Sequence, residues 1–361
     1  MQKIKTKKII YVLGTKAQFI KCKQILLNLI KENVEILILD TGQHKELTIK
    51  ELNESGLVYE YLELSENKKN IATIFGMISW FVKILFSLKL KNKLSGISYS
   101  MVHGDTVSTL IGLLFSKRNK IKTIHLESGY KSNNIFQPFP EEIIRNIVSR
   151  FSDVLVVDGE SQYKNISKYI NKKEIIKISR NTIYDSVAEY LKTEQENFKN
   201  TLTITVHRTE NIYNKKRLES LIDLLYEIKN KYNFEIIQWF CHDVTRNILS
   251  KNNLINEIEA NGIILKNLIP HNEFIKEIVR SKLIITDGGS IAEECSILGL
   301  NTVIWRDVVE NESYLNQNVI LSNYEYEKIY SYIENLPNRK SNLNNVESPS
   351  EELVMKIAPY L

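Results

Sequence analysis

Three acidic residues in the first half of the chain either follow predicted strands or open a predicted helix. Asp105 comes after the alternating run 96–103, which breaks at Gly104, and Glu127 comes directly after the run 122–126. Glu141 opens a helical pattern that prolines precede. Because the strands of an open parallel sheet present their carboxyl ends to one ligand crevice, we expect the three acids to lie near one another.

Such a cluster predicts proton transfer. Close carboxylates raise one another's pKa, which tunes a general acid or base toward neutral pH. A single Asp or Glu in such a position is more often a helix cap or a salt-bridge partner. Three of them together favour proton transfer at carbon or oxygen.

The elements that would position these acids repeat a strand–helix alternation twice. With 361 residues the chain exceeds one ordinary core, so we expect an α/β fold with two doubly wound domains and a ligand cleft between them. The first domain would span residues 1–180, with a C-terminal helix at 350–361 packing back on it, and the second residues 181–349. The expected strands are 8–13, 35–40, 98–103, 122–126, 154–157, 201–206, 235–240, 262–265, 283–286 and 302–305.

Charge and cysteine usage narrow the class of ligand and the compartment. A net charge of +5 fits an anionic small molecule, and the chain lacks the concentrated basic patches of a nucleic-acid binder. Cys22, Cys241 and Cys295 have neither paired nor metal-ligand spacing, which favours a reducing cytoplasm. No two histidines share a zinc-like spacing, so no metal site is predicted.

One apolar stretch raises the question of a membrane. Residues 71–90 are crowded with large apolar side chains, but Lys83 lies in the middle of the stretch. A spanning helix needs about 20 predominantly apolar residues, so a buried helix is expected and contact with a membrane surface is the alternative. The apolar run 9–13 is too short for a signal peptide and predicts the first strand.

Each half also carries a loop that could bind an anion. Residues 14–16 follow the first strand and open a helix that contains Lys21, so backbone N–H groups and two cations would meet there. Residues 286–290 follow a strand and open a helix with Glu293 and Glu294 in its expected first turn, which suits a pyrophosphate and its ribose. An ordinary glycine turn is the alternative there.

Two further observations concern the chemistry of the second half. His207 and Arg208 end its first strand, and an imidazole beside a guanidinium suits a diphosphate or a glycosyl oxygen. Neither a dinucleotide glycine fingerprint nor a Walker lysine loop is present, which argues against a nicotinamide enzyme or an NTPase.

These motifs, taken in order, resemble the UDP-N-acetylglucosamine 2-epimerase family. The similarity runs from Tyr11 to about Glu310. It rests on residues 14–21, 41–44, 102–106, 125–129, 140–142, 181–182, 207–208 with 210–211, and 286–290 with 293–294.

The resemblance implies two Rossmann-like domains in a GT-B arrangement, with no metal and no redox cofactor. It also implies a UDP-sugar substrate held mainly by the second domain, and a homodimer. In the family, the C2 proton is removed while the bond from C1 to the UDP oxygen breaks. The resulting 2-acetamidoglucal takes UDP back with C2 inverted.

Roles carried over from the family attach to particular residues of this chain. Asp105, Glu127 and Glu141 would be the acid/base carboxylates, in an order that the sequence leaves open, and Lys21 and His207 would stabilise the leaving diphosphate. The remaining substrate contacts would come from Lys16, Arg145, Asn181, Arg208, His242, Gly288, Gly289, Ser290, Glu294 and Arg306. A second substrate molecule, as in some bacterial relatives, would bind beside Gln43 and His44.

The chain departs from the family pattern at several positions. Lys16 replaces a common arginine, Arg180 replaces a common glycine, and residues 308–311 replace Thr-Thr-Glu-Arg. A non-hydrolysing epimerase that serves surface polysaccharide synthesis is the leading hypothesis. The alternatives are a hydrolysing epimerase, a GT-B glycosyltransferase and a nucleotide-sugar-binding regulator without catalysis.

Overall fold

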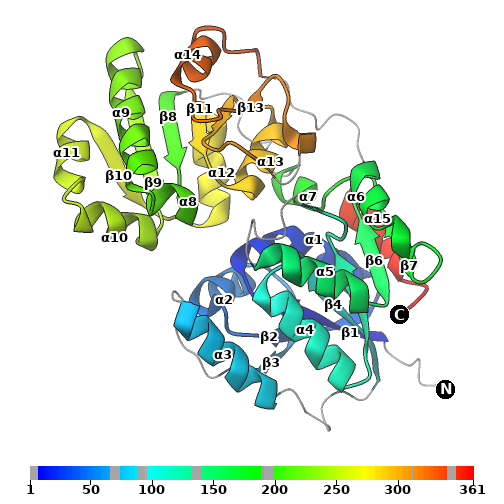
Figure 1. The fold of residues 1–361 in the computed structure, drawn as a ribbon. Helices are drawn as coiled ribbons and strands as arrows, with labels where there is room; N and C mark the ends of the chain where they lie inside the picture. Colours follow the sequence, from blue (N-terminus) through cyan, green and yellow to red (C-terminus); the bar gives the residue numbers. More distant parts are fainter. Residues whose placement is uncertain are drawn as a thin grey trace. The chain divides into compact units, whose positions relative to one another are not determined.

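The computed structural model describes residues 7–65, 74–87, 94, 96–131, 140–188, 190, 199–309, 312–339 and 347–361. It divides the chain into two compact units, each built on its own parallel sheet (Figure 1). Unit 1 comprises Met1–Ser186 and Glu347–Leu361, and unit 2 comprises Val187–Val346. The sequence had placed these boundaries after residues 180 and 349.

In the described part of unit 1, seven strands form a parallel sheet in the order β3-β2-β1-β4-β5-β6-β7. The order reverses between β1 and β4, which is where open α/β sheets bind ligands outside their carboxyl ends. The strands are β1 (Lys7–Leu13), β2 (Val34–Asp40), β3 (Glu60–Glu63), β4 (Ile97–His103), β5 (Lys122–Leu126), β6 (Val154–Val157) and β7 (Glu174–Lys177).

Alternate residues of β1 separate two hydrophobic cores, one on each face of this sheet. Tyr11 packs in a core with Phe19 of α1 and Leu353 of α15, whereas Val12 packs in the core on the other face with Trp80 of α3. Burial on both faces explains why the central strands are continuous apolar runs. The helices are α1 (Lys16–Lys31), α2 (Lys45–Asn53), α3 (Ile74–Ser87), α4 (Val107–Arg118), α5 (Glu141–Phe151), α6 (Glu160–Asn165), α15 (Pro349–Ile357) and α7 (Ile183–Ala188), whose last residues, from Val187 on, belong to unit 2.

The described part of unit 2 repeats the same topology with six strands in the order β10-β9-β8-β11-β12-β13, so its reversal lies between β8 and β11. The strands are β8 (Lys199–Thr205), β9 (Ile236–Cys241), β10 (Ile263–Asn267), β11 (Ser281–Thr286), β12 (Thr302–Ile304) and β13 (Val319–Leu321). The helices are α8 (Thr209–Ile212), α9 (Lys215–Lys231), α10 (Asp243–Lys251), α11 (Ile255–Ala260), α12 (His271–Arg280), α13 (Gly289–Leu298) and α14 (Tyr326–Glu334).

The apolar stretch at 71–90 forms helix α3 over the residues that the structure describes there. Trp80 and Ile84 are buried, and the Trp80 indole donates a hydrogen bond of 2.9 Å to the Thr41 carbonyl oxygen. Phe86 is exposed near the end of the helix. Within the described ranges of the chain, no helix is both long and apolar enough to cross a membrane.

Candidate active site

Polar residues follow four central strands at the carboxyl edge of the unit 1 sheet. Lys16 begins α1 just after β1, Asp105 follows β4, Glu127 follows β5 and Asp158 follows β6. The reversal between β1 and β4 therefore lies beside this group of side chains. Asp105 and Glu127 are two of the predicted acids, and Asp158 was not predicted.

Glu127 is held by a cation and an amide. Lys21, on α1, forms an ion pair with Glu127 Oε1, and the Asn181 amide nitrogen donates to the same oxygen at 2.6 Å. The Glu127 backbone has a φ of 60°, a left-handed conformation that costs a non-glycine residue on the order of 1 kcal/mol. Hydrogen bonds of Ser128 to Val156 and His125 stabilise this turn. The carboxylate is therefore held in a defined orientation.

The pKa of Glu127 is lower than the cluster of acids predicts. Burial alone would raise it, but the charges of Lys21 and His103 and the Asn181 hydrogen bond lower it to about 2. The expectation that close carboxylates raise one another's pKa is therefore wrong for Glu127. The reason is that Lys21 neutralises it from 106 residues away in the sequence.

Asp105 shows the opposite shift. Burial raises its pKa, the Arg145 guanidinium opposes that shift, and the charge of Glu127 adds to it. Arg145, on α5, forms ion pairs with both Asp105 and Glu142. Glu141 is the first residue of α5, one helical turn before Arg145 and therefore on the same face of the helix. Two neighbouring carboxyls thus have pKa values that their surroundings push apart, as acid/base pairs require.

Two buried histidines line the same strand ends. Burial lowers the pKa values of both His103 and His125 to about 4, so both rings are neutral at pH 7. His125 Nε2 lies 2.8 Å from the Gly104 carbonyl oxygen, and its Nδ1 lies 3.3 Å from the Ser149 hydroxyl of α5. His125 thereby ties the turn before Asp105 to the helix that carries Arg145.

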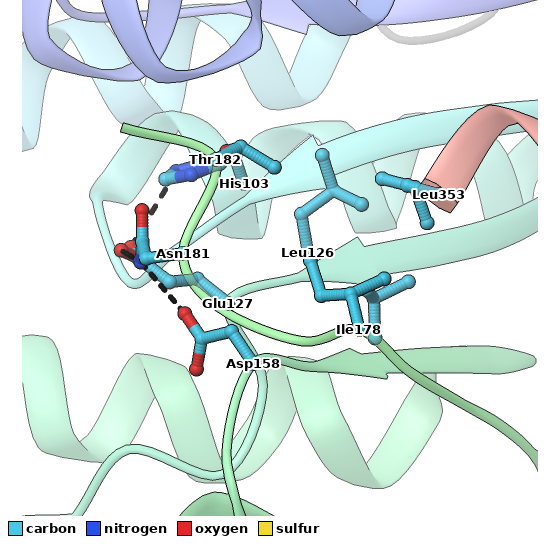
Figure 2. A pocket seen from close by; sticks show the side chains of 9 residues that line it. His103, Leu126, Glu127, Asp158, Ile178, Asn181, Thr182 and Leu353 are labelled. Carbon is cyan, nitrogen blue, oxygen red and sulfur yellow. Dashed lines mark hydrogen bonds and ion pairs between the residues drawn. The ribbon is translucent and has the colours of Figure 1, made fainter. Parts of the chain in front are cut away.

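Asp158 is the functional candidate that sequence reasoning missed. Its Oδ2 accepts hydrogen bonds from the Tyr130 hydroxyl at 2.8 Å and from the Asn181 amide nitrogen at 2.7 Å, so Asn181 joins Asp158 to Glu127 (Figure 2). The signal was present, because Asp158 directly follows the predicted strand 154–157 just as Glu127 follows 122–126.

Four of the polar residues of this site, His103, Glu127, Asp158 and Asn181, line a small cavity. Its volume is about 10 Å³, close to the roughly 10–15 Å³ that one water molecule requires. One side of the wall is polar and the other is apolar (Figure 2). The lining residues are His103, Leu126, Glu127, Val156, Asp158, Ile178, Asn181, Thr182 and Leu353.

Lys16, Gln43 and His44 lie in and beside the first loop of the same unit. The Lys16 ammonium is 2.9 Å from a carboxylate oxygen of Glu51. The Gln43 side chain accepts a hydrogen bond of 2.6 Å from Ser108, and the His44 backbone N–H donates to the Gly14 carbonyl oxygen at 3.1 Å. Of the residues predicted for a second substrate, His44 thus contacts the loop that follows β1, and Gln43 contacts helix α4.

In unit 2, buried Asp287 connects the two strand ends beside the reversal. It accepts hydrogen bonds from the backbone N–H of His207 at 3.1 Å, from that of Arg208 at 2.8 Å and from the Asn211 side chain at 2.9 Å. The rings of His207 and His242 stack with centroids 4.2 Å apart. Burial lowers the pKa of His207, although the Asp287 charge opposes the shift.

Two arginines of unit 2 share one acid. Arg208 lies 3.6 Å and Arg306 lies 3.7 Å from the same carboxylate oxygen of Glu210. Val308 and Val309 lie just beyond Arg306, in the segment 308–311 that departs from the family pattern. The last two residues of that segment, Glu310 and Asn311, lie outside the described residues. Three predicted substrate contacts, Arg208, His242 and Arg306, therefore extend from loops that follow strands of this sheet.

The glycine loop of unit 2 opens helix α13, as predicted, but the acids lie deeper in that helix. Gly288 is the N-cap, and Gly289 and Ser290 are the first helical residues. Glu294 is therefore in the second turn, and the expectation that Glu293 and Glu294 lie in the first turn is wrong. Glu294 is buried, and its Oε1 lies 2.7 Å from His271 Nε2. Its Oε2 has no hydrogen-bond partner among the described residues.

A family model described as UDP-N-acetylglucosamine 2-epimerase matches residues 28–354. The chain belongs to this family. A UDP-N-acetylglucosamine 2-epimerase of Methanocaldococcus jannaschii is 29% identical over an alignment of 377 positions, which covers 98% of this chain and 99% of that protein. A UDP-2,3-diacetamido-2,3-dideoxy-D-glucuronate 2-epimerase of Pseudomonas aeruginosa is 25% identical, with 84% of each chain covered.

Membership of the UDP-N-acetylglucosamine 2-epimerase family agrees with the solved structures. A crystal structure of the M. jannaschii UDP-GlcNAc 2-epimerase in complex with UDP-GlcNAc and UDP has a TM-score of 0.81 and 25% identity, and the match covers 98% of this chain and 100% of that chain. The predicted family, the fold of two doubly wound α/β domains and the enzyme class of nucleotide-sugar epimerase are confirmed. Among the described residues, no group of three or more His, Cys, Asp or Glu could hold a metal ion.

Proposed function

We propose that the protein interconverts UDP-N-acetylglucosamine and UDP-N-acetylmannosamine, or a close pair of UDP-acetamido sugars, without net hydrolysis. The C2 proton is removed as UDP leaves C1, which gives a 2-acetamidoglucal. A proton is then delivered to C2 from the opposite face, and UDP adds back at C1. The observation that carries the proposal is the pair of neighbouring carboxyls, Asp105 and Glu127, with oppositely shifted pKa values. Inversion at C2 needs one group to take a proton and another to deliver one.

The cations beside these carboxyls suit a diphosphate leaving group. Lys21 is bound to Glu127, and a phosphate oxygen can compete with that carboxylate for the ammonium. When Lys21 turns to the diphosphate, Glu127 loses the charge that lowers its pKa and becomes a better base. Binding of UDP and activation of the acid/base group are thus linked through one side chain.

Unit 2 supplies groups that suit the nucleotide. The N-terminus of α13 at Gly289 and Ser290 can receive a phosphate, and the unpartnered oxygen of buried Glu294 can accept hydrogen bonds from ribose hydroxyls. His207, with the neighbouring Arg208, is assigned to the diphosphate. The M. jannaschii relative bound to UDP-GlcNAc and UDP supports the choice of substrate.

Proton NMR of the protein with UDP-N-acetylglucosamine in deuterated water tests the proposal. We expect deuterium at C2 in a mixture of gluco and manno UDP-sugars. Free sugar with stoichiometric UDP would instead establish the hydrolysing reaction, and UDP release that depends on an acceptor would establish a glycosyltransferase. No change would contradict this substrate, and the P. aeruginosa relative then makes UDP-diacetamido sugars the next to test.

We also infer a homodimer in a reducing cytoplasm, where the enzyme would serve surface polysaccharide synthesis. The family supports the dimer, and three buried free thiols, Cys22, Cys241 and Cys295, support the compartment. Light scattering of the purified protein measures the oligomeric state, and a monomer at every concentration would contradict the dimer.

A further inference from the structure

Asp158 and Glu127 both accept hydrogen bonds from the Asn181 side-chain amide. The Asn181 nitrogen has two hydrogens, and it lies 2.6 Å from Glu127 Oε1 and 2.7 Å from Asp158 Oδ2. The orientation of the Asn181 side-chain amide is fixed by its oxygen, because Oδ1 accepts a hydrogen bond of 3.0 Å from the Ile183 backbone N–H. The amide therefore presents one hydrogen to each carboxylate.

The surroundings of Asp158 keep a negative charge close to Glu127. The Tyr130 hydroxyl donates to Asp158 Oδ2 at 2.8 Å, and Asp158 Oδ1 is buried with no hydrogen-bond partner in the described part of the chain. The other charged or titratable groups that face it are Glu127, Lys21 on α1 and His103, which lines the same cavity from β4. The cavity wall is completed by apolar residues, including Leu126, so the charge is poorly screened.

We propose that Asp158 is a positioning residue for Glu127. Through Asn181 it fixes the direction of the Glu127 carboxylate, and its negative charge raises the proton affinity of that carboxylate once Lys21 engages the substrate diphosphate. The inference rests on the proposed function, because it concerns the strength of a base in that reaction.

The charge of Asp158 changes within a pH range where the enzyme can be assayed. Burial and the charge of Glu127 raise the pKa of Asp158 to about 6, although the Tyr130 hydroxyl, Lys21 and Asn181 oppose this shift. Above that pH Asp158 is ionised and supports Glu127. Below it Asp158 is neutral, so turnover falls as the pH decreases through about 6.

Asp158→Asn separates charge from hydrogen bonding. The Asn oxygen can still accept hydrogen bonds from Tyr130 and Asn181. We therefore expect a kcat roughly tenfold lower at pH 8 and a KM within about twofold of wild type. The acidic limb of the pH profile of kcat, which is the fall in kcat below about pH 6, should disappear. Glu160→Gln is the matched control, because it removes an exposed carboxylate two residues away that pairs with Lys177. The control should keep the wild-type kcat and pH profile.

Tyr130→Phe tests the same network in a second way. It removes a hydrogen bond that lowers the pKa of Asp158, so the acidic limb should move to higher pH while kcat at pH 8 stays within about threefold of wild type. A limb that stays in place in both variants would overturn the proposal. So would an Asp158→Asn enzyme with unchanged kcat and raised KM, because Asp158 would then bind substrate directly.

A measurement without turnover separates this inference from the proposed function. Carbon-13 NMR of carboxyl-labelled full-length protein with UDP bound reports the pKa of Glu127, whose signal is identified as the one lost in Glu127→Gln. We expect a lower pKa for Glu127 in Asp158→Asn than in wild type. An unchanged pKa of Glu127 in Asp158→Asn overturns the role of Asp158, whichever reaction the enzyme catalyses. A lower pKa of Glu127 in that variant, combined with no C2 exchange by wild type, contradicts only the proposed function.

Discussion

The two sheets share a strand order, yet the acids at corresponding strand ends have different partners. Asp105 follows β4 and Asp287 follows β11, so each lies beside the reversal of its own sheet. Asp105 faces the guanidinium of Arg145, whereas Asp287 accepts backbone N–H groups from the neighbouring strand end. The topology fixes where an acid emerges, and the local donors decide whether it can exchange a proton.

The same contrast extends to the cations. In unit 1, ammonium and guanidinium groups are paired with acids. The charge of Lys21 helps to lower the pKa of Glu127 to about 2, whereas burial raises the pKa of Asp105 against the charge of Arg145. In unit 2, stacked histidines and two arginines around Glu210 leave the strand ends rich in donors. Two copies of one architecture thus provide one edge suited to acid/base chemistry and another suited to holding anions.

The most direct test of this contrast between the two sheets is to neutralise Asp105. Asp105→Asn should lower kcat by roughly 10³-fold, because the variant can neither take nor give a proton, while UDP binding stays within about threefold of wild type. Epimerisation and C2 exchange are followed by NMR, and UDP affinity by calorimetry. A variant that kept a tenth of the wild-type rate would show that Asp105 is not an acid/base group.

The corresponding change in unit 2 should affect folding rather than chemistry. Asp287→Ala leaves the N–H groups of His207 and Arg208 without their acceptor, and the cost should be about 3 kcal/mol in the free energy of unfolding. Urea denaturation measures this loss. Full stability combined with loss of kcat would instead place Asp287 among the reacting groups and would remove the contrast with Asp105.

Much of this arrangement could be predicted because central strands of parallel sheets are long apolar runs. Strands β5 and β6 occur with the bounds expected for 122–126 and 154–157. The edge strands β3, β7 and β13 were missed, because they are only three or four residues long and two of them carry charged residues at both ends. Edge strands bury little, so the hydrophobic pattern there is weak.

The electrostatics of the site could not be predicted from spacing along the chain. The strand-end rule located Asp105 and Glu127, but their pKa shifts depend on burial and on the charges of Lys21 and Arg145, which tertiary packing brings there. The link between Glu127 and Asp158 through Asn181 likewise joins three separate loops. Local sequence places a residue at an edge, whereas contacts between distant segments determine its charge.

Stability at low pH tests whether the negative charge of Glu127 stabilises the fold. Its pKa of about 2 is below the ordinary value of 4.5, so its ionised form stabilises the fold above pH 4.5 and this contribution is lost as the pH falls toward 2. Between pH 5 and pH 3, wild type should lose about 2 kcal/mol more of its unfolding free energy than Glu127→Gln does. Parallel pH profiles from chemical denaturation would show that Lys21 does not stabilise the Glu127 charge.

The smallest expected effect concerns Glu294 in unit 2. His271→Phe removes the donor 2.7 Å from Glu294 Oε1, so the carboxylate loses the partner that holds its other oxygen in place for the proposed contact with a ribose. The Kd for UDP should rise about fivefold, which is roughly 1 kcal/mol, with kcat at saturation unchanged. Asn272→Ala is the control, because this neighbouring residue is exposed and its side-chain oxygen accepts the backbone N–H of Glu273. If His271→Phe lowered kcat and left Kd unchanged, the edge of unit 2 would take part in the chemistry and the division between the two sheets would fail.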